Sequence, residues 1–279
     1  MRNVWQEPQP FGWEDHVRAA LSEDVYSGDI TSSAIPTGRL VNWYIEAQAT
    51  GIVCGVGIVA YLFGEDTECL VSDGAQVTPG TVVAKGSLEG NHALQVERTA
   101  LNYLMMLSGV STLTNSFVKT VEGTGAKIVD TRKTVPLMRH LQKYAVRCGG
   151  GHNHRMGLYD AVMIKDNHIR AHGSITAAVE ATRHKISHLY KIEIECDHPE
   201  QVAEAVNAGA DVILLDNMLP AVMAEVVQEF QGKAVFEASG GVALSTVRAI
   251  AESGVNVISV GALTHSAPSL AFHLELSQG

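Results

Sequence analysis

The chain has 279 residues, of which 46% are hydrophobic and 18% are charged, and it carries 20 Lys and Arg against 30 Asp and Glu. This composition is typical of a folded globular protein and excludes disordered and fibrous classes, and the length allows two domains or one large α/β barrel. No apolar run approaches the roughly 18 residues of a membrane span, and the formal charge of −10 favours neither a membrane nor a nucleic acid as partner.

The cysteines and the N-terminus bear on the compartment. Cys54, Cys69, Cys148 and Cys196 are scattered and form no CxxC pair, which is typical of reduced thiols and not of a disulfide framework or a zinc site. The N-terminal residues contain no apolar signal core, so we expect no export. Both observations predict a cytoplasmic protein.

Residues 1–110 predict a small α/β domain that includes a helical connection to the next one. The elements expected from periodicity and turn residues are a helix over 13–24, strands over 41–49 and 52–54, a helix over 57–63, and strands over 69–71 and 81–86. The tail, residues 268–279, contains alternating apolar and polar residues, and we expect it to return to this domain as a strand.

A long helix is predicted at the end of the first domain. Asn91 can cap it, and we expect Gly109 to interrupt it before a further helix reaches Val121. Its apolar face, which a partner subunit could cover, includes Leu101, Leu104 and Met105.

Strand and helix signals alternate over the second predicted domain, residues 111–267. Strands are expected over 127–130, 161–164, 190–195, 211–215, 234–238 and 256–260, and helices over 137–147, 174–185, 199–208, 220–229 and 245–252. Alternation with short links favours a parallel sheet with crossover helices, although six units are fewer than the eight of a closed barrel.

A basic segment, residues 131–170, lies within this domain. It holds eight Lys and Arg against two acids, a formal charge of +6 in an acidic chain, which favours a small polyanion as ligand. Arg139, Lys143 and Arg147 recur every four residues, which is typical of a solvated helix face. The other cations stand near strand ends, where parallel α/β folds bind ligands.

Two of these cations follow the first strand directly. The planar guanidinium of Arg132 suits a carboxylate and the point charge of Lys133 suits a phosphate, although each could be a surface charge. Lys165 follows the second strand and is either a simple cation or a Schiff-base lysine. The pair His152 and His154 could be half of a metal site, but no third ligand of matching spacing stands out.

Carboxylates and glycines follow the later strands. Glu193 and Glu195 lie on one face of the third strand and Asp216 ends the fourth, where acids either pair with nearby cations or act on a substrate. Glycine-rich loops after the last strands can bind phosphate through backbone N–H groups, although glycine also serves tight turns. The candidate phosphate-binding residues are Ser239, Gly240, Gly241 and Gly261.

These motifs together resemble one family, quinolinate phosphoribosyltransferase, also called nicotinate-nucleotide pyrophosphorylase (carboxylating). The matching segments, in order and spacing, are 97–102 (ERTALN), 131–134 (TRKT), 149–155 (GGGHNHR), 165–168 (KDNH), Glu195, 215–217 (LDN) and 239–241 (SGG). The resemblance covers nearly the whole chain. It implies an α/β fold, an open, incomplete (β/α) barrel of about six strands with a smaller N-terminal α/β sandwich domain.

The resemblance also implies an activity. The family transfers phosphoribosyl from phosphoribosyl pyrophosphate to quinolinate with decarboxylation, which gives nicotinate mononucleotide, pyrophosphate and CO₂ in NAD biosynthesis. It implies Mg²⁺ as the cofactor and a homodimer with shared active sites, or a higher oligomer.

The candidate site residues, from their positions and from the resemblance together, divide by role. The catalytic set is Lys133, Lys165, Glu195 and Asp216, of which Glu195 and Asp216 also face the metal. The substrate-binding set is Arg98, Arg132, His154, Arg155, Lys165, Ser239, Gly240, Gly241 and Gly261. Arg98 would reach the site of a neighbouring subunit, whereas the sequence alone also allows a surface arginine paired with Glu97. The proton donor after decarboxylation stays open between Lys133 and Lys165.

Three other functions deserve comparison. A molybdate-linked homologue of the family would use another acceptor, but the loss of a diacid substrate should relax the set of five cationic residues. A Schiff-base lyase would rely on Lys165, and borohydride trapping would reveal it. A non-catalytic binder of phosphorylated metabolites would need no carboxylates at strand ends, and this chain has at least two, Glu195 and Asp216.

Overall fold

The computed structural model describes residues 4–278. Its contacts divide the chain into two compact units, of which the first comprises residues up to 115, residues 135–150 and residues from 266 onward. The second comprises residues 116–134 and 151–265. This division differs from the predicted boundary at residue 110, because residues 135–150 pack with the first unit.

The first unit is built on an antiparallel sheet. The strands are β1 (Leu40–Ala47), β2 (Gly51–Ile52), β3 (Glu68–Cys69), β4 (Gln76–Val77), β5 (Val82–Glu89) and β12 (Phe272–Gln278). The main sheet has the order β12-β1-β5-β3, while β2 and β4 pair separately. The predicted return of the tail is observed, since β12 pairs with residues 41–47 of β1. Alternate side chains of β1, Trp43, Ile45 and Ala47, are buried, as expected for a sheet with one covered face.

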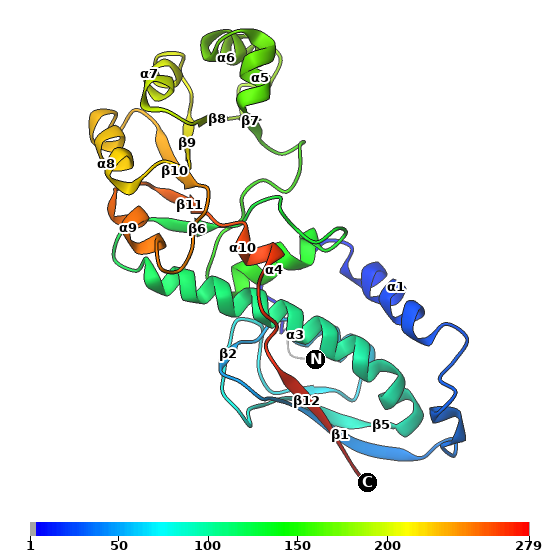
Figure 1. Ribbon diagram of the computed structural model, residues 1–279. Helices are drawn as coiled ribbons and strands as arrows, with labels where there is room; N and C mark the ends of the chain where they lie inside the picture. Colours follow the sequence, from blue (N-terminus) through cyan, green and yellow to red (C-terminus); the bar gives the residue numbers. More distant parts are fainter. Residues whose placement is uncertain (1–3, 279) are drawn as a thin grey trace. The chain divides into compact units, whose positions relative to one another are not determined.

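Helices complete this unit (Figure 1). They are α1 (Trp13–Val25), the short 3₁₀ turn η1 (Ser32–Ala34), α2 (Val56–Phe63), the N-terminal part of α3 (Gly90–Thr120) and α4 (Arg139–Cys148). Asp73 ties two of them together, because its carboxylate accepts the N–H groups of Gly55 and Val56 at the start of α2 and the hydroxyl of Tyr144 in α4. Lys143 in α4 is fully buried, so the predicted solvated face of this helix is wrong.

The expected break at Gly109 is also wrong, because α3 continues through it. Glycine weakens a helix by only about 1 kcal/mol, and tertiary packing outweighs that cost. Only glycine leaves room here for the chain that packs against the helix, because a Cβ at this position would collide with the backbone of Pro268 and Ser269. Leu101 and Leu104 are buried within the chain, so they do not offer the open face that we expected a partner to cover.

We expect Gly109→Ala to destabilise the protein. Helix propensity alone would favour alanine by about 1 kcal/mol, but displacing the backbone at Pro268 should cost roughly 1–3 kcal/mol. Urea denaturation should therefore show a lower midpoint for Gly109→Ala, while Asn102→Ala, an exposed change on the same helix, should leave it nearly unchanged. An unchanged or raised midpoint for Gly109→Ala would contradict the close packing.

The second unit is a parallel α/β structure. Its strands are β6 (Lys127–Val129), β7 (Val162–Ile164), β8 (Ile192–Cys196), β9 (Val212–Asp216), β10 (Val235–Ser239) and β11 (Val257–Ser259). They form one sheet of order β6-β11-β10-β9-β8-β7, in which every pair is parallel. Within residues 4–278 the end strands β6 and β7 do not pair with each other, so the predicted open, incomplete barrel of six strands is confirmed.

Crossover helices lie along one side of these strands (Figure 1). They are α6 (Ile175–Arg183), α7 (Pro199–Asn207), α8 (Pro220–Glu229) and α9 (Val247–Glu252), with the short helices α5 (Asp166–His172) and α10 (Ala262–His265) at strand ends. Helix α5 was not expected from the sequence. Of the helices in the described part of the chain, none has the length and apolar character that crossing a membrane requires.

Candidate active site

The strand register places a row of side chains on one face of the parallel sheet. Met163 lies beside Glu193, and Leu214 lies between Glu195 and Glu237 on its two neighbouring strands. Because side chains alternate along a strand, the residues two positions further along share that face. The face therefore also carries Lys165, Asp216 and Ser239.

This face opens into a pocket of about 440 Å³, which is large enough for a small-molecule ligand. Its lining residues are Thr131, Arg132, Lys133, His154, Arg155, Met163, Lys165, Glu195, Leu214, Asp216, Glu237, Ser239 and Ser259. Eight residues predicted for the site are therefore gathered in one pocket. A pocket of similar volume in the first unit is lined by aromatic residues, and its charged lining residues are Glu14 and Glu65, so it offers an anion no cation.

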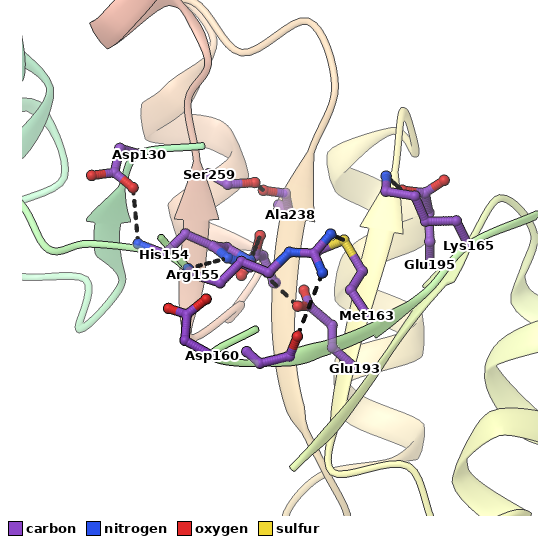
Figure 2. A network of polar contacts seen from close by, with 12 residues as sticks. Asp130, His154, Arg155, Asp160, Met163, Lys165, Glu193, Glu195, Ala238 and Ser259 are labelled. Carbon is purple, nitrogen blue, oxygen red and sulfur yellow. Dashed lines mark hydrogen bonds and ion pairs between the residues drawn. The ribbon is translucent and has the colours of Figure 1, made fainter. Parts of the chain in front are cut away.

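Lys165 and Glu195 form a close ion pair at this pocket (Figure 2). The lysine side chain is 43% exposed and the glutamate 16%, so the pair lies at the pocket wall with its ammonium still accessible. A Schiff base requires a neutral amine, whereas this ammonium lies against a carboxylate. The contact therefore favours the reading of Lys165 as a simple cation.

The loop that carries His154 is held beside β6. His152 forms an isolated parallel bridge with Val129, which continues the sheet by one residue. The fully buried Asp130 then accepts the backbone N–H of His154 at 2.9 Å (Figure 2). It also accepts the side-chain amide of Asn153 at 2.6 Å. These contacts place His154 and Arg155 over the sheet face. Asp130 was not recognised in the sequence, although a carboxylate that ends an apolar strand was a usable signal.

The His154 ring has protein partners at both nitrogens. Nε2 lies 3.3 Å from a carboxylate oxygen of Glu193 and 3.5 Å from one of Glu237, while Nδ1 accepts the backbone N–H of Arg155 at 2.7 Å. Burial, with the charge of Glu193 beside it, raises the pKa of Glu237 to about 7, and His154 opposes that shift. Glu237 was missed from the sequence, although an acid inside the apolar run of a strand was a signal for it.

Two guanidinium groups lie at the same pocket. The Nη atoms of Arg155 lie 3.5 Å from the carbonyl oxygen of Ala161 and 3.5 Å from the sulfur of Met163. Burial lowers the pKa of Arg155, and the nearby charge of Arg132 lowers it further, while Glu193 opposes this shift. Two cations that repel each other across a pocket form a favourable site for an anion with two negative groups.

Lys133 lies against the loop that follows β11. The hydroxyl of Thr264 donates to the Lys133 carbonyl at 2.8 Å, and a Cβ on Gly261 would lie 3.1 Å from the lysine side chain. Gly240 and Gly241 after β10 both have positive φ, 94° and 58°, which favours glycine. The three predicted glycines are not among the residues that line the pocket, but Gly261 lies against the side chain of Lys133, which does line it.

Glu195 and Asp216 stand at the ends of the neighbouring strands β8 and β9 and both line the pocket. The side-chain amide of Asn217 donates to Asp216 at 2.7 Å and leaves the other carboxylate oxygen for a ligand. Carboxylate oxygens are the donors that Mg²⁺ prefers, and it usually binds one or two of them together with water and substrate phosphates. The two residues therefore fit the implied magnesium ion.

Arg98 does not belong to this pocket. It lies on α3 in the first unit, its side chain is 63% exposed, and its Nη2 atom is 3.8 Å from Glu97. It lines a separate pocket of about 300 Å³ together with Glu23, Asp24 and Tyr103. A weak, exposed pair of this kind contributes little to stability and leaves the guanidinium available for another contact.

Comparison with known proteins places this geometry in context. Residues 29–108 match the family described as quinolinate phosphoribosyl transferase, N-terminal domain, and residues 110–275 match the corresponding C-terminal domain. The nicotinate-nucleotide pyrophosphorylase (carboxylating) of Mycobacterium leprae is 40% identical over 275 residues, which cover 94% of this chain and 96% of the relative.

Solved structures agree with the sequence comparisons. The crystal structure of nicotinate-nucleotide pyrophosphorylase from Ehrlichia chaffeensis is 37% identical and superposes with a TM-score of 0.92 over 95% of this chain and 99% of that one. The structure of NadC from Streptococcus pyogenes is 34% identical, with a TM-score of 0.92 over 98% of this chain and 99% of that one.

Proposed function

We propose that this chain, which belongs to the quinolinate phosphoribosyltransferase family, transfers phosphoribosyl from phosphoribosyl pyrophosphate to quinolinate with loss of CO₂, giving nicotinate mononucleotide and pyrophosphate for NAD biosynthesis. The observation that carries the proposal is the single pocket in which strand-end cations surround strand-end carboxylates. Cations there match a diacid and a phosphorylated donor, and carboxylates match a reaction that develops positive charge.

The diacid binds to the guanidinium groups. Arg132 and Arg155 face one pocket and affect each other electrostatically, so each can take one carboxylate of quinolinate. Lys165 adds a third positive charge at the wall. His154 lies in the same pocket and belongs to the same diacid site, although both of its ring nitrogens already have protein partners.

The phosphoribosyl donor occupies the other side of the pocket. Lys133 and the loops at 239–241 and 261 take its phosphate groups through an ammonium and through backbone N–H groups. Glu195 and Asp216 hold a Mg²⁺ ion and the ribose hydroxyls. When bound, the ion neutralises charge on the pyrophosphate leaving group.

The chemistry then needs no nucleophilic side chain. The pyridine nitrogen of quinolinate attacks C1 of the ribose as pyrophosphate leaves, and Glu195 and Asp216 stabilise the oxocarbenium-like charge. The positively charged ring loses its 2-carboxylate as CO₂, because N⁺ stabilises the electron pair left on C2. A proton at C2 completes the product, and Lys133 and Lys165 are the candidate donors.

The remaining proposals concern assembly and compartment. We propose a homodimer with shared active sites, or a higher oligomer, in which Arg98 reaches the pocket of a neighbouring subunit; its exposure and weak pairing support this role. A cytoplasmic location is supported by four free cysteines, Cys54, Cys69, Cys148 and Cys196.

Turnover is expected only when quinolinate, phosphoribosyl pyrophosphate and Mg²⁺ are all present. Release of CO₂ from quinolinate labelled at the 2-carboxylate should follow the formation of nicotinate mononucleotide in equal amounts. Chelating the metal should stop turnover, since pyrophosphate would have to leave without an ion to neutralise its charge. Full turnover with chelator would refute the metal proposal, and equal turnover with nicotinate as acceptor would refute the diacid proposal.

A further inference from the structure

His154 of the diacid site meets two buried glutamates, Glu193 and Glu237, which take no part in the chemistry above. His154 Nε2 lies between Glu193 on β8 and Glu237 on β10, at 3.3 and 3.5 Å, and the side chains are 14%, 8% and 5% exposed. Oε1 of each glutamate is buried without a hydrogen-bond partner, and in Glu237 this is the oxygen that lies nearest the ring, whereas Glu193 approaches the ring with Oε2. Burying a carboxylate costs free energy unless a neighbouring group compensates its charge. A cluster of two such groups is therefore a candidate for a functional role.

The hydrogen bonds of the ring assign its tautomer. The backbone N–H of Arg155 can only donate, and it points at Nδ1 of His154 at 2.7 Å. Nδ1 must therefore carry a lone pair, and the proton of the neutral ring lies on Nε2. This proton lies on the edge of the ring whose nearest carboxylate oxygens are those of Glu193, at 3.3 Å, and Glu237, at 3.5 Å from Nε2.

A metal ion is the competing explanation for such a cluster. The ligand atoms of His154, Glu193 and Glu237 lie within 4.8 Å of one another, which is close enough for three metal ligands. Binding an ion through Nε2 would move the ring proton to Nδ1, where it would meet the N–H of Arg155. The hydrogen bond to Nδ1 therefore favours acceptance of Nε2–H over metal ligation.

The two glutamates do not carry two full negative charges. Burial and Glu193 raise the pKa of Glu237 to about 7, so near neutral pH the two glutamates are not both fully ionised. Arg155 is a cation near Glu193, whose charge raises the pKa of the arginine. An imidazolium is not required to balance two full negative charges.

We propose that Glu193 and Glu237 are positioning residues of the diacid site: they accept the Nε2–H of neutral His154 and so hold the ring that orients Arg155. Asp130 fixes the backbone N–H of His154, and the ring fixes the backbone N–H of Arg155 through Nδ1. The glutamates secure the opposite edge of that ring. His154 then contributes to quinolinate binding by positioning Arg155 and not through a charge of its own. This inference rests on the proposed function.

The tautomer can be measured without any substrate. In the full-length protein with ¹⁵N-labelled histidine, the His154 signals are assigned by their absence in His154→Asn. We expect an unprotonated Nδ1 and a protonated Nε2 near neutral pH. A doubly protonated ring, a proton on Nδ1, or a shift of these signals on adding Zn²⁺ would overturn the proposal. This measurement stands even if quinolinate proves not to be the substrate.

The kinetic test compares two replacements of Glu237. Gln retains a carbonyl acceptor for Nε2–H, whereas Met has a similar length, offers only a weak acceptor and suits the apolar strand. Glu237→Met should raise the KM for quinolinate roughly tenfold or more, because a buried donor loses its partner, with a smaller change in kcat and none in the KM for phosphoribosyl pyrophosphate.

Glu237→Gln should remain within a few-fold of the wild type, since rescue by an acceptor is the signature of positioning. The proposal fails if the folded Met variant keeps the wild-type KM, or if Gln is as defective as Met. The same pair of changes at Glu193 repeats the test should either variant of Glu237 not fold. Absence of turnover by the wild type would instead refute the proposed function and leave the ring measurement standing.

Discussion

Arg132→Ala is expected to abolish measurable quinolinate binding while the protein still folds. The change removes a guanidinium that can form two charge-assisted hydrogen bonds to one carboxylate, and it leaves that carboxylate unpaired in the pocket. The loss should be about 2–5 kcal/mol, which corresponds to a roughly 30- to 5,000-fold weaker affinity. Isothermal titration calorimetry with quinolinate measures it directly.

Two variants control this experiment. Arg132→Lys keeps the charge without the planar fork, so its affinity should lie between those of the wild type and the alanine variant. Arg170→Ala removes an exposed arginine that pairs with Asp166 and does not line the pocket, and it should bind quinolinate like the wild type. Near-native affinity in folded Arg132→Ala protein would show that the diacid binds elsewhere.

Mixing two inactive variants is expected to restore activity. Arg98→Ala and Lys133→Ala should each be inactive alone, the first at a site shared with a partner and the second within its own pocket. If Arg98 acts in a neighbouring subunit, each mixed dimer has one site with both changes and one site with neither. Random exchange of equal amounts should then return about a quarter of the wild-type activity.

The matched control for this mixture is Arg132→Ala combined with Lys133→Ala. Both residues line the pocket of the same unit, so exchange leaves one change in every site and the mixture should stay inactive. Mass spectrometry of intact dimers confirms that exchange took place. Mixed dimers of Arg98→Ala and Lys133→Ala without activity would rule out a shared site.

Local sequence signals predicted the parallel sheet well. All six strands lie within a residue or two of the predicted positions, because buried parallel strands are short apolar runs that turn residues delimit. The positions of Arg132, Lys133, Lys165 and Asp216 follow from these strand ends. Their meeting in one pocket then follows from the parallel arrangement, since all carboxyl ends lie at one edge of the sheet.

Local signals failed where another element decided the outcome. Glycine at position 109 predicted a break in the helix, but α3 continues through it and the residue packs against Pro268. Helix α5 was overlooked because it is short. The backbone N–H of Lys165 donates to Nδ1 of His168 at its first turn, and Gly173 ends it with a φ of 93°. Lys143 lies on a helix whose spacing predicts solvent, yet it is fully buried.

The sequence by itself determined the order of strands and helices, the residues at strand ends and, through its motifs, the family. These depend on periodicity and spacing, which are local properties of the chain. Only the tertiary structure decided that residues 135–150 pack with the first unit, that β1 is the strand with which the returning tail pairs, and that Glu237 meets His154. Such contacts join residues far apart in the chain, and their energy comes from burial and register between elements, which no local pattern encodes.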